Sequence, residues 1–272
     1  MRRAFSTLAC MELGWQQVLS CAAEAKMDAV EIRVDNHGRI FGLIDDQLLP
    51  LAAAFRETGT KISNLGTSLC ISTYTPEKLP DVCRYAAMAQ VLGARGIRIF
   101  LGSFIKRFSE VRTADETGIV RFLQEAADLA LARGVEIWIE THNEYSTGPS
   151  LRPLLDRINR SNVRVIWDIL HSVEFGETPE DTLRLLGSDI VHVHIKDGTR
   201  QTDPDLIEYR HTSLGEGELP ISHIMDLLEN AGYRGCYSLE WENAWREEIR
   251  HLYPDLPQLL KAWNAFLSEM DV

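Results

Sequence analysis

The sequence alternates eight short β-rich runs with longer stretches of helical periodicity, and this alternation constrains the fold more than any other feature. The runs span residues 4–9, 28–34, 61–68, 96–102, 135–141, 163–169, 189–195 and 236–242. Between them, segments such as 116–134 and 221–235 place apolar residues at helical spacing. Strands that alternate with helices form parallel β/α units, and a count of eight favours a closed barrel over an open doubly wound sheet. We therefore predict an α/β protein with a (β/α)8 TIM barrel.

Glycines mark the ends of several predicted helices. Gly93, Gly134 and Gly232 each follow a helical stretch and precede a β-rich run, as expected of a helix C-terminus. No linker-like or low-complexity segment divides the chain, so we expect residues 1–272 to form a single domain. No G-x-G-x-x-G motif follows the first strand, which disfavours dinucleotide binding.

The composition, with 45% hydrophobic and 25% charged residues, is that of a soluble globular protein. The formal net charge of -12, without a concentrated basic run, makes nucleic acid an unexpected partner. No segment approaches the roughly 20 apolar residues of a membrane span, so no membrane partner is expected and a cytoplasmic location is the default. The five cysteines include no C-x-x-C pair, so neither a disulfide framework nor a structural zinc site is predicted.

The run VHVHIK at 191–196 carries an unusual row of basic side chains. Because side chains alternate along a strand, His192, His194 and Lys196 face one way and the branched apolar residues between them face the other. The β-branched face indicates a packed strand. The basic face therefore points into the barrel or toward its rim.

Each of the last four predicted strands carries, near its carboxyl end, a residue of a kind that commonly binds metal ions. These are Glu140, Asp168, His194 and Glu240. A barrel of this kind builds its active site at the carboxyl ends of its strands, so we expect the four side chains at one rim. A single such carboxylate is more often solvated, but three clustered carboxylates repel one another unless a cation compensates them. The set suits one divalent ion, namely Mn²⁺, Mg²⁺, Co²⁺ or Zn²⁺.

Five motifs in this chain resemble the xylose-isomerase-like TIM-barrel superfamily, which is the sugar phosphate isomerase/epimerase group. They are IETHNE (139–144), WDILH (167–171), VHVHIKD (191–197), LGEGELP (214–220) and SLEWE (238–242). They cover the C-terminal half densely, whereas the N-terminal half matches through its β/α rhythm and VEIR at 30–33. The resemblance supports the fold strongly and the substrate weakly.

The resemblance implies one divalent metal ion held by Glu140, Asp168, His194 and Glu240. It also implies that Glu140 and Glu240 form the acid/base pair, one removing a proton from the substrate carbon while the other returns one. A proton next to a carbonyl is too weakly acidic for a carboxylate until the developing enediolate is stabilised, which is the part that the metal plays. Proton transfer between positioned carboxylates then becomes feasible.

Other residues near these motifs have two readings each. His171 resembles the substrate-binding histidine of the family, with a structural role as the alternative. Lys196 with Asp197 either contacts substrate or forms a structural ion pair. His192 either orients His194 or is a core histidine bonded to backbone or water.

The second strand adds two further candidate pocket residues, Glu31 and Arg33, which share one face. They either grip substrate hydroxyls or a carboxylate, or form an ion pair that fills the barrel. His142 follows the first predicted metal ligand and is expected to bind substrate, with a supporting contact to the metal ligands as the alternative. Trp241 and Trp245 either wall the site or pack in the core.

The reaction itself stays open among related chemistries. The leading hypothesis is a metal-dependent isomerase or epimerase of a sugar, sugar acid or ketose, with a small-molecule carbohydrate as its partner. A dehydratase of the inosose or dehydroshikimate type begins with the same enolisation, and a non-catalytic sugar-binding barrel is the third alternative. No phosphate-binding glycine loop is evident, which favours an unphosphorylated substrate. A homodimer is the default oligomeric state.

Overall fold

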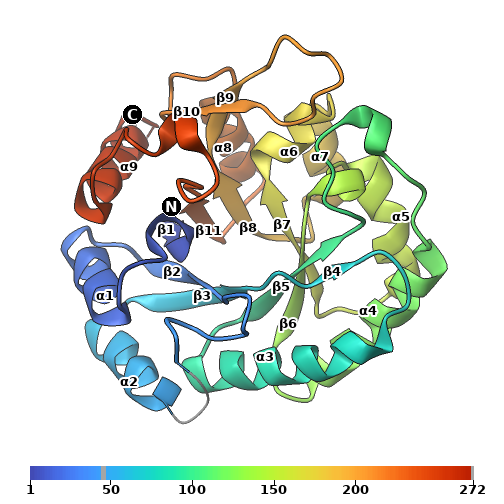
Figure 1. Cartoon of the computed structure of the whole chain (residues 1–272), viewed down its shortest axis with the longest axis horizontal. Coiled ribbons are helices and arrows are strands. Elements are labelled where there is room, and N and C mark those ends of the chain that lie inside the picture. The colour runs from blue at the N-terminus through green and yellow to red at the C-terminus, as the bar shows by residue number, and fades with distance from the viewer. Residues whose placement is uncertain (44–46, 271–272) are drawn as a thin grey trace.

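The computed structural model describes residues 1–43 and 47–270, and within these ranges eight parallel strands close into a barrel (Figure 1). The strands are β1 (Arg2–Ser6), β2 (Ala29–Arg33), β3 (Lys61–Gly66), β5 (Gly96–Leu101), β6 (Glu136–Glu140), β7 (Val163–Asp168), β8 (Ile190–Ile195) and β11 (Cys236–Leu239). The order β3-β2-β1-β11-β8-β7-β6-β5 is closed by pairing of β3 with β5. The predicted TIM barrel is confirmed: seven of the β-rich runs each contain a whole barrel strand, and the first run, 4–9, overlaps β1 at residues 4–6.

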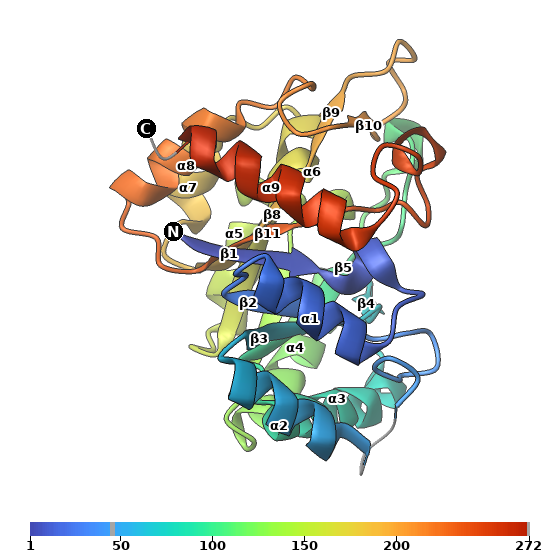
Figure 2. The same cartoon turned by 90° about the vertical axis from the view of Figure 1, so that its left-hand side faces the viewer.

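Helices surround the barrel, as Figures 1 and 2 show. They are α1 (Trp15–Glu24), α2 (Leu48–Thr58), α3 (Leu79–Leu92), α4 (Glu116–Leu131), α5 (Gly148–Ile158), α6 (Ile169–Glu174), α7 (Pro179–Leu186), α8 (Ile221–Asn230) and α9 (Leu256–Met270). Gly93 ends α3 in the left-handed conformation, and Gly134 and Gly232 also have positive φ just beyond α4 and α8. The prediction that helices end at these glycines is therefore confirmed.

The two faces of the barrel strands differ in chemistry. Their outer faces carry branched apolar residues such as Val165, Val193 and Ile195, which belong to the main buried core with the helices. Inside the barrel, Trp138, Ile166 and Val191 form a small separate apolar cluster. The rest of the barrel interior includes many buried polar side chains. Most apolar packing therefore lies between the outer faces of the strands and the helices, and less of it lies inside the barrel.

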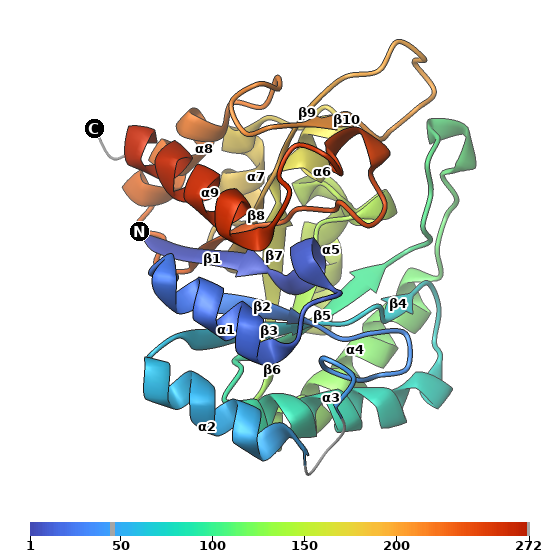
Figure 3. The ribbon, with the colours of Figure 1, turned by 60° about the vertical axis from the view of Figure 1, so that its left-hand side comes forward.

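A short hairpin and the loop after it lie beyond the end of β8 (Figure 3). Its strands are β9 (Asp197–Thr199) and β10 (Arg210–Thr212). The Asp197 carboxylate accepts hydrogen bonds from the backbone N–H groups of Gly198, Gly215, Gly217 and Leu219, at 2.8 to 3.3 Å. A Cβ on Gly217 would collide with that carboxylate, so the LGEGELP glycines are needed for this close approach. Asp197 therefore fixes the loop and is not the partner of Lys196.

No helix in the two described ranges is both long enough and apolar enough to cross a bilayer. The five cysteines are all free thiols, and Cys10 is buried. Burial raises the pKa of the thiol of Cys70 to about 11, so it is protonated at neutral pH.

We expect Trp263 to be essential for the packing of α9 against β1. The side chain is fully buried, and its indole Nε1 donates to the carbonyl of Ala4 at 3.0 Å. Trp263→Ala should lower the free energy of unfolding by about 3–5 kcal/mol, because it leaves a large cavity and an unpaired carbonyl. Urea denaturation measures this loss. Trp245→Ala is the matched control, since Trp245 is 55% exposed, and a Trp263→Ala loss no larger than the control's would contradict the prediction.

Candidate active site

The structure brings the four predicted metal ligands together at the carboxyl ends of neighbouring strands. Glu140 ends β6, Asp168 ends β7, His194 lies in β8 and Glu240 directly follows β11. One ligand atom from each lies within 4.8 Å of the others, and no side chain of the four is more than 3% exposed. Register explains the grouping, because Asp168 pairs with His194 across β7 and β8, and His194 with Ser238 across β8 and β11.

The His194 ring is oriented with one nitrogen bound and the other unpaired. Its Nε2 lies 2.8 Å from Glu31 Oε2, and because a carboxylate only accepts, Nε2 carries the proton. Its Nδ1 is buried with no hydrogen-bond partner among the described residues. That atom lies 3.5 Å from Glu240 Oε2 and 3.7 Å from oxygens of both Asp168 and Glu140. Burial acts to lower the pKa of His194, but Glu240, Glu31 and Glu140 outweigh it and hold that pKa well above its usual value, so Nδ1 carries a proton here. An imidazole held by a carboxylate on one side, with its other nitrogen facing three carboxylates, fits a divalent ion that would take the place of this proton.

Arg98, in β5, is a central member of the site that the sequence analysis missed. Its Nη1 lies 2.8 Å from Glu140 Oε2, 3.3 Å from Glu240 Oε1 and 3.6 Å from Glu31 Oε1. The guanidinium also lies over the Phe100 ring, 4.5 Å from its centroid. Arg98 could have been identified from the sequence, because it is the one charged residue of the apolar run GIRIFLG and lies on the inward face of that strand.

Lys196 is the second buried cation of the site. Its Nζ lies 2.7 Å from oxygens of Asp168, Glu240 and Glu242. Of the two readings from sequence, the ion pair is present, but with these three carboxylates and not with Asp197. The clustered carboxylates therefore do not by themselves require a metal, because Arg98 and Lys196 already compensate part of their charge. The fit of a metal depends instead on the free Nδ1 of His194.

Two of the predicted ligands are held in different protonation states. Burial raises the pKa of Glu140 to about 7, with Glu240 adding to the rise and Arg98 opposing it. Burial also acts to raise the pKa of Asp168, but His171 and Lys196 outweigh it and hold that pKa well below its usual value. Near neutral pH, Glu140 can therefore both accept and donate a proton, whereas Asp168 stays ionised.

His171 and His142 form a pair beside the ligands, with ring centroids 4.2 Å apart. His171 Nδ1 lies 2.7 Å from Glu174 Oε2, a partner three residues away that the sequence analysis did not identify. Burial lowers the pKa of His171, but Asp168 and Glu174 overcome that effect and raise it to about 9. Burial holds the pKa of His142 well below its usual value. One imidazole is thus a cation and the other is neutral.

Glu31 and Arg33 do not form the ion pair that was one of their predicted roles. Glu31 is fully buried and bonds to His192 Nε2 at 3.1 Å as well as to His194, and the cation that faces it is Arg98. Glu31 therefore lies behind His194, where it orients the ring, and His192 touches Glu31 instead of orienting His194 directly. Arg33 donates to two main-chain carbonyls, at 2.6 and 2.8 Å.

The two tryptophans near the last strand have different surroundings. Trp241 is buried and packs edge-to-face against Tyr253, with ring centroids 5.2 Å apart, so it belongs to the core. Trp245 is mostly exposed and lines a cavity of about 450 Å³ together with Arg33. Because Arg33 ends β2, this cavity opens at the same end of the barrel as the four ligands.

Comparison with known sequences finds a family model described as a xylose isomerase-like TIM barrel, which matches residues 19–255. The uncharacterized protein MJ1311 of Methanocaldococcus jannaschii is 27% identical over 154 residues, which is 54% of this chain and 48% of that protein. Inosose dehydratase of Bacillus cereus (strain AH820) is 27% identical over 134 residues, 44% of this chain and 45% of the enzyme. These alignments span about half the length of each relative.

Solved structures share the whole fold. A structure of the IOLI protein with a binding zinc atom has a TM-score of 0.80 and 18% identity, covering 99% of this chain and 98% of that one. D-psicose 3-epimerase from Clostridium cellulolyticum H10, solved with D-tagatose, has a TM-score of 0.77 and 18% identity, covering 98% and 99%. At this identity the likeness concerns the fold alone. Because the family model spans most of the sequence, the chain belongs to the xylose isomerase-like TIM barrel family.

Proposed function

We propose that this protein is a divalent-metal-dependent isomerase or epimerase of a small carbohydrate with a hydroxyl group next to its carbonyl. The observation that carries the proposal is the free, buried Nδ1 of His194 facing the carboxylates of Glu140, Asp168 and Glu240. The D-psicose 3-epimerase that shares the fold is consistent with this class of reaction.

Glu140, Asp168, His194 and Glu240 would hold the ion, which supplies the positive charge that makes a proton next to the carbonyl acidic. Glu140, at the end of β6 and beside Glu240, is placed to exchange a proton with the substrate carbon. Glu240 is the second carboxylate, and Arg98 Nη1 contacts both, so it fixes their separation. In this proposal one glutamate removes the proton and the other returns it.

The neighbouring groups are suited to bind the polar groups of a sugar. The imidazolium of His171 is held by Glu174 and can donate to a substrate oxygen, while the neutral His142 beside it can accept from a hydroxyl. Lys196, which was also predicted to bind substrate, pairs with Asp168, Glu240 and Glu242 and so holds these carboxylates in place beside the substrate. Arg33, near the rim cavity, is placed to contact the far end of a substrate. Glu31 was also predicted to bind substrate, but in this proposal it acts by orienting the His194 ring.

A dehydratase is the second candidate, and the position of His171 favours it. Loss of water after enolisation requires an acid that protonates the departing hydroxyl, and the imidazolium of His171 lies beside the ligands, with its Nε2 3.8 Å from Asp168 Oδ2. Lys196 is less suited to this role, because Asp168, Glu240 and Glu242 outweigh burial and hold its pKa well above its usual value. The partial match to inosose dehydratase agrees with this chemistry. A non-catalytic sugar-binding barrel has less support, because binding alone does not require an acid/base pair.

We expect Glu240→Gln to abolish substrate C–H exchange with solvent deuterium, measured by NMR on metal-loaded protein with a panel of ketoses and inososes. The loss should be about 10²- to 10⁴-fold, because an amide cannot carry the proton. Glu216→Gln, at an exposed carboxylate of the LGEGELP loop, is the matched control. Exchange at the native rate in a folded, metal-loaded Glu240→Gln protein would remove Glu240 from the acid/base pair.

We expect the native protein to bind about one divalent ion per chain and Asp168→Asn to bind far less. Glu31→Gln should lower the metal affinity about 10- to 100-fold, because it removes the carboxylate that orients His194. Competition with a fluorescent chelator measures both effects, and circular dichroism checks that the variants are folded. If native protein that has been incubated with Mn²⁺, Co²⁺, Mg²⁺ and Zn²⁺ binds none of them, the proposed centre does not exist.

The mass of the product separates the two candidate reactions. An isomerase or epimerase gives a product of the same mass as its substrate, whereas a dehydratase gives one that has lost a molecule of water. We expect mass spectrometry of a substrate that shows deuterium exchange to give an unchanged mass, after correction for the deuterium. Loss of water at the rate of exchange would favour the dehydratase.

A further inference from the structure

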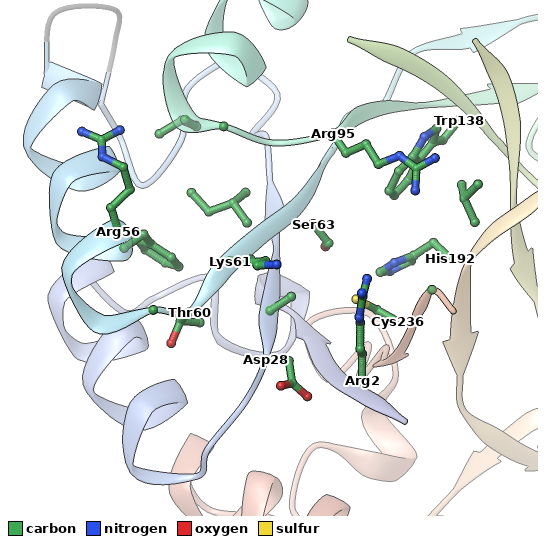
Figure 4. A pocket seen from close by; sticks show the side chains of 18 residues that line it. Arg2, Asp28, Arg56, Thr60, Lys61, Ser63, Arg95, Trp138, His192 and Cys236 are labelled. Carbon is green, nitrogen blue, oxygen red and sulfur yellow. The ribbon is translucent and has the colours of Figure 1, made fainter. Parts of the chain in front are cut away.

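A cavity of about 610 Å³, seen in Figure 4, lies at the amino-terminal ends of the barrel strands. The four ligands lie at the opposite end of the barrel. Its lining includes the starts of four strands, at Arg2, Ala29, Lys61 and Cys236. The volume is within the range of about 300–1,000 Å³ that is typical of small-molecule pockets. The proposed function makes no use of this cavity.

Small side chains explain why this end of the barrel is hollow. Ala29, Ser63, Gly235 and Cys236 line the cavity, where barrels of this type usually carry branched apolar residues. Gly96 has a specific reason to be glycine, because a Cβ there would lie 2.6 Å from the indole of Trp138. The indole therefore occupies the space beside β5 and forms an apolar wall of the cavity.

Four cationic side chains line the cavity, namely Arg2, Arg56, Lys61 and Arg95. Arg95 pairs with Glu136 at 3.0 Å, whereas no ion pair links the other three to any residue in the described ranges. Asp28 is the one carboxylate in the lining, and its Oδ2 already accepts from the backbone N–H of Arg3 at 2.8 Å. The cations come from separate segments, so the sequence shows no basic run. In a chain of net charge -12, such a cluster attracts small anions to one place.

The deep part of the cavity offers a free hydrogen-bonding atom. His192 lines the cavity and is completely buried, and its Nε2 is occupied by Glu31 at 3.1 Å. Its Nδ1 has no hydrogen-bond partner among the described residues, which is uncommon for a buried ring nitrogen. A hydroxyl group both donates and accepts, so it can pair with Nδ1 in either protonation state. Burial raises the pKa of the Cys236 thiol to about 11, so this neighbour adds no negative charge.

We propose that this cavity is a binding site for a small organic anion that carries at least one hydroxyl group. The anionic group lies among Arg2, Lys61 and Arg95, and the hydroxyl reaches toward His192, which Figure 4 shows facing the same space. Trp138 and the apolar lining pack against the carbon skeleton. Binding here does not depend on the proposed reaction being correct, since the charged residues of this site are at the other end of the barrel; the two ends share only the contact of Glu31 with both His192 and His194.

Isothermal titration calorimetry at low ionic strength tests the proposal, with 3-phosphoglycerate and D-gluconate as probes. Inorganic phosphate and glycerol each carry only one of the two features and should bind more weakly. Lys61→Glu should weaken binding of the better probe at least about tenfold, because an attractive charge becomes a repulsive one. Lys261→Glu is the matched control, since Lys261 is exposed on α9 and its change alters the net charge equally. Added salt should weaken binding of the probe.

The variant Asp168→Asn distinguishes probe binding in this cavity from probe binding at the proposed metal centre. It should bind the probe as the native protein does, because Asp168 lies at the other end of the barrel. Three results would overturn the proposal: neither probe binds in the millimolar range, Lys61→Glu binds as well as Lys261→Glu, or Asp168→Asn removes binding while Lys61→Glu retains it. None of these bears on the proposed reaction, which is tested by deuterium exchange. Conversely, a protein without exchange activity can still bind the anion here.

Discussion

The stability of this structure depends on how the carboxylates buried inside one end of the barrel are compensated. Unpaired carboxylates in a low-dielectric interior would cost far more free energy than a domain of this size can offset. Arg98 and Lys196 offset this cost, because Arg98 contacts oxygens of Glu31, Glu140 and Glu240, and Lys196 contacts oxygens of Asp168, Glu240 and Glu242. These contacts join β2, β5, β6, β7, β8 and the residues after β11 across the interior. The polar centre is therefore also a structural link between strands.

The sequence was sufficient to predict the barrel because its information is local. Each strand is a β-rich run with a helical stretch before the next, and the alternation of side chains along 192–196 separates the inward row from Val193 and Ile195 without reference to distant residues. Val191 departs from this alternation, because the register between β7 and β8 shifts beside it, and it joins the apolar cluster inside the barrel. The grouping of the four ligands followed from one general rule, that parallel strands end at the same rim. Their individual roles stay predictions.

What the sequence did not predict depends on contacts between distant segments. Arg98 meets Glu240 from 142 positions away, and Asp197 meets the loop around Gly217 from 20 positions away. The cavity with Arg2, Arg56 and Lys61 is likewise assembled from separate strands and loops. The pairing of His171 with Glu174 is different, because residues three apart on a helix are neighbours. That pair was accessible from the sequence.

Glu31 occupies a position that joins the two ends of the barrel. One of its oxygens, Oε2, bonds to His194, which belongs to the proposed metal centre, and to His192, which lines the cavity at the amino-terminal end of the barrel. Two ligands that contact the two histidines would compete for, or reinforce, the orientation of the same carboxylate. Thermodynamic linkage then requires that any effect of one ligand on the affinity of the other be matched by an equal effect in the reverse direction. A single buried oxygen atom thus gives this barrel the physical means for cooperativity along its axis.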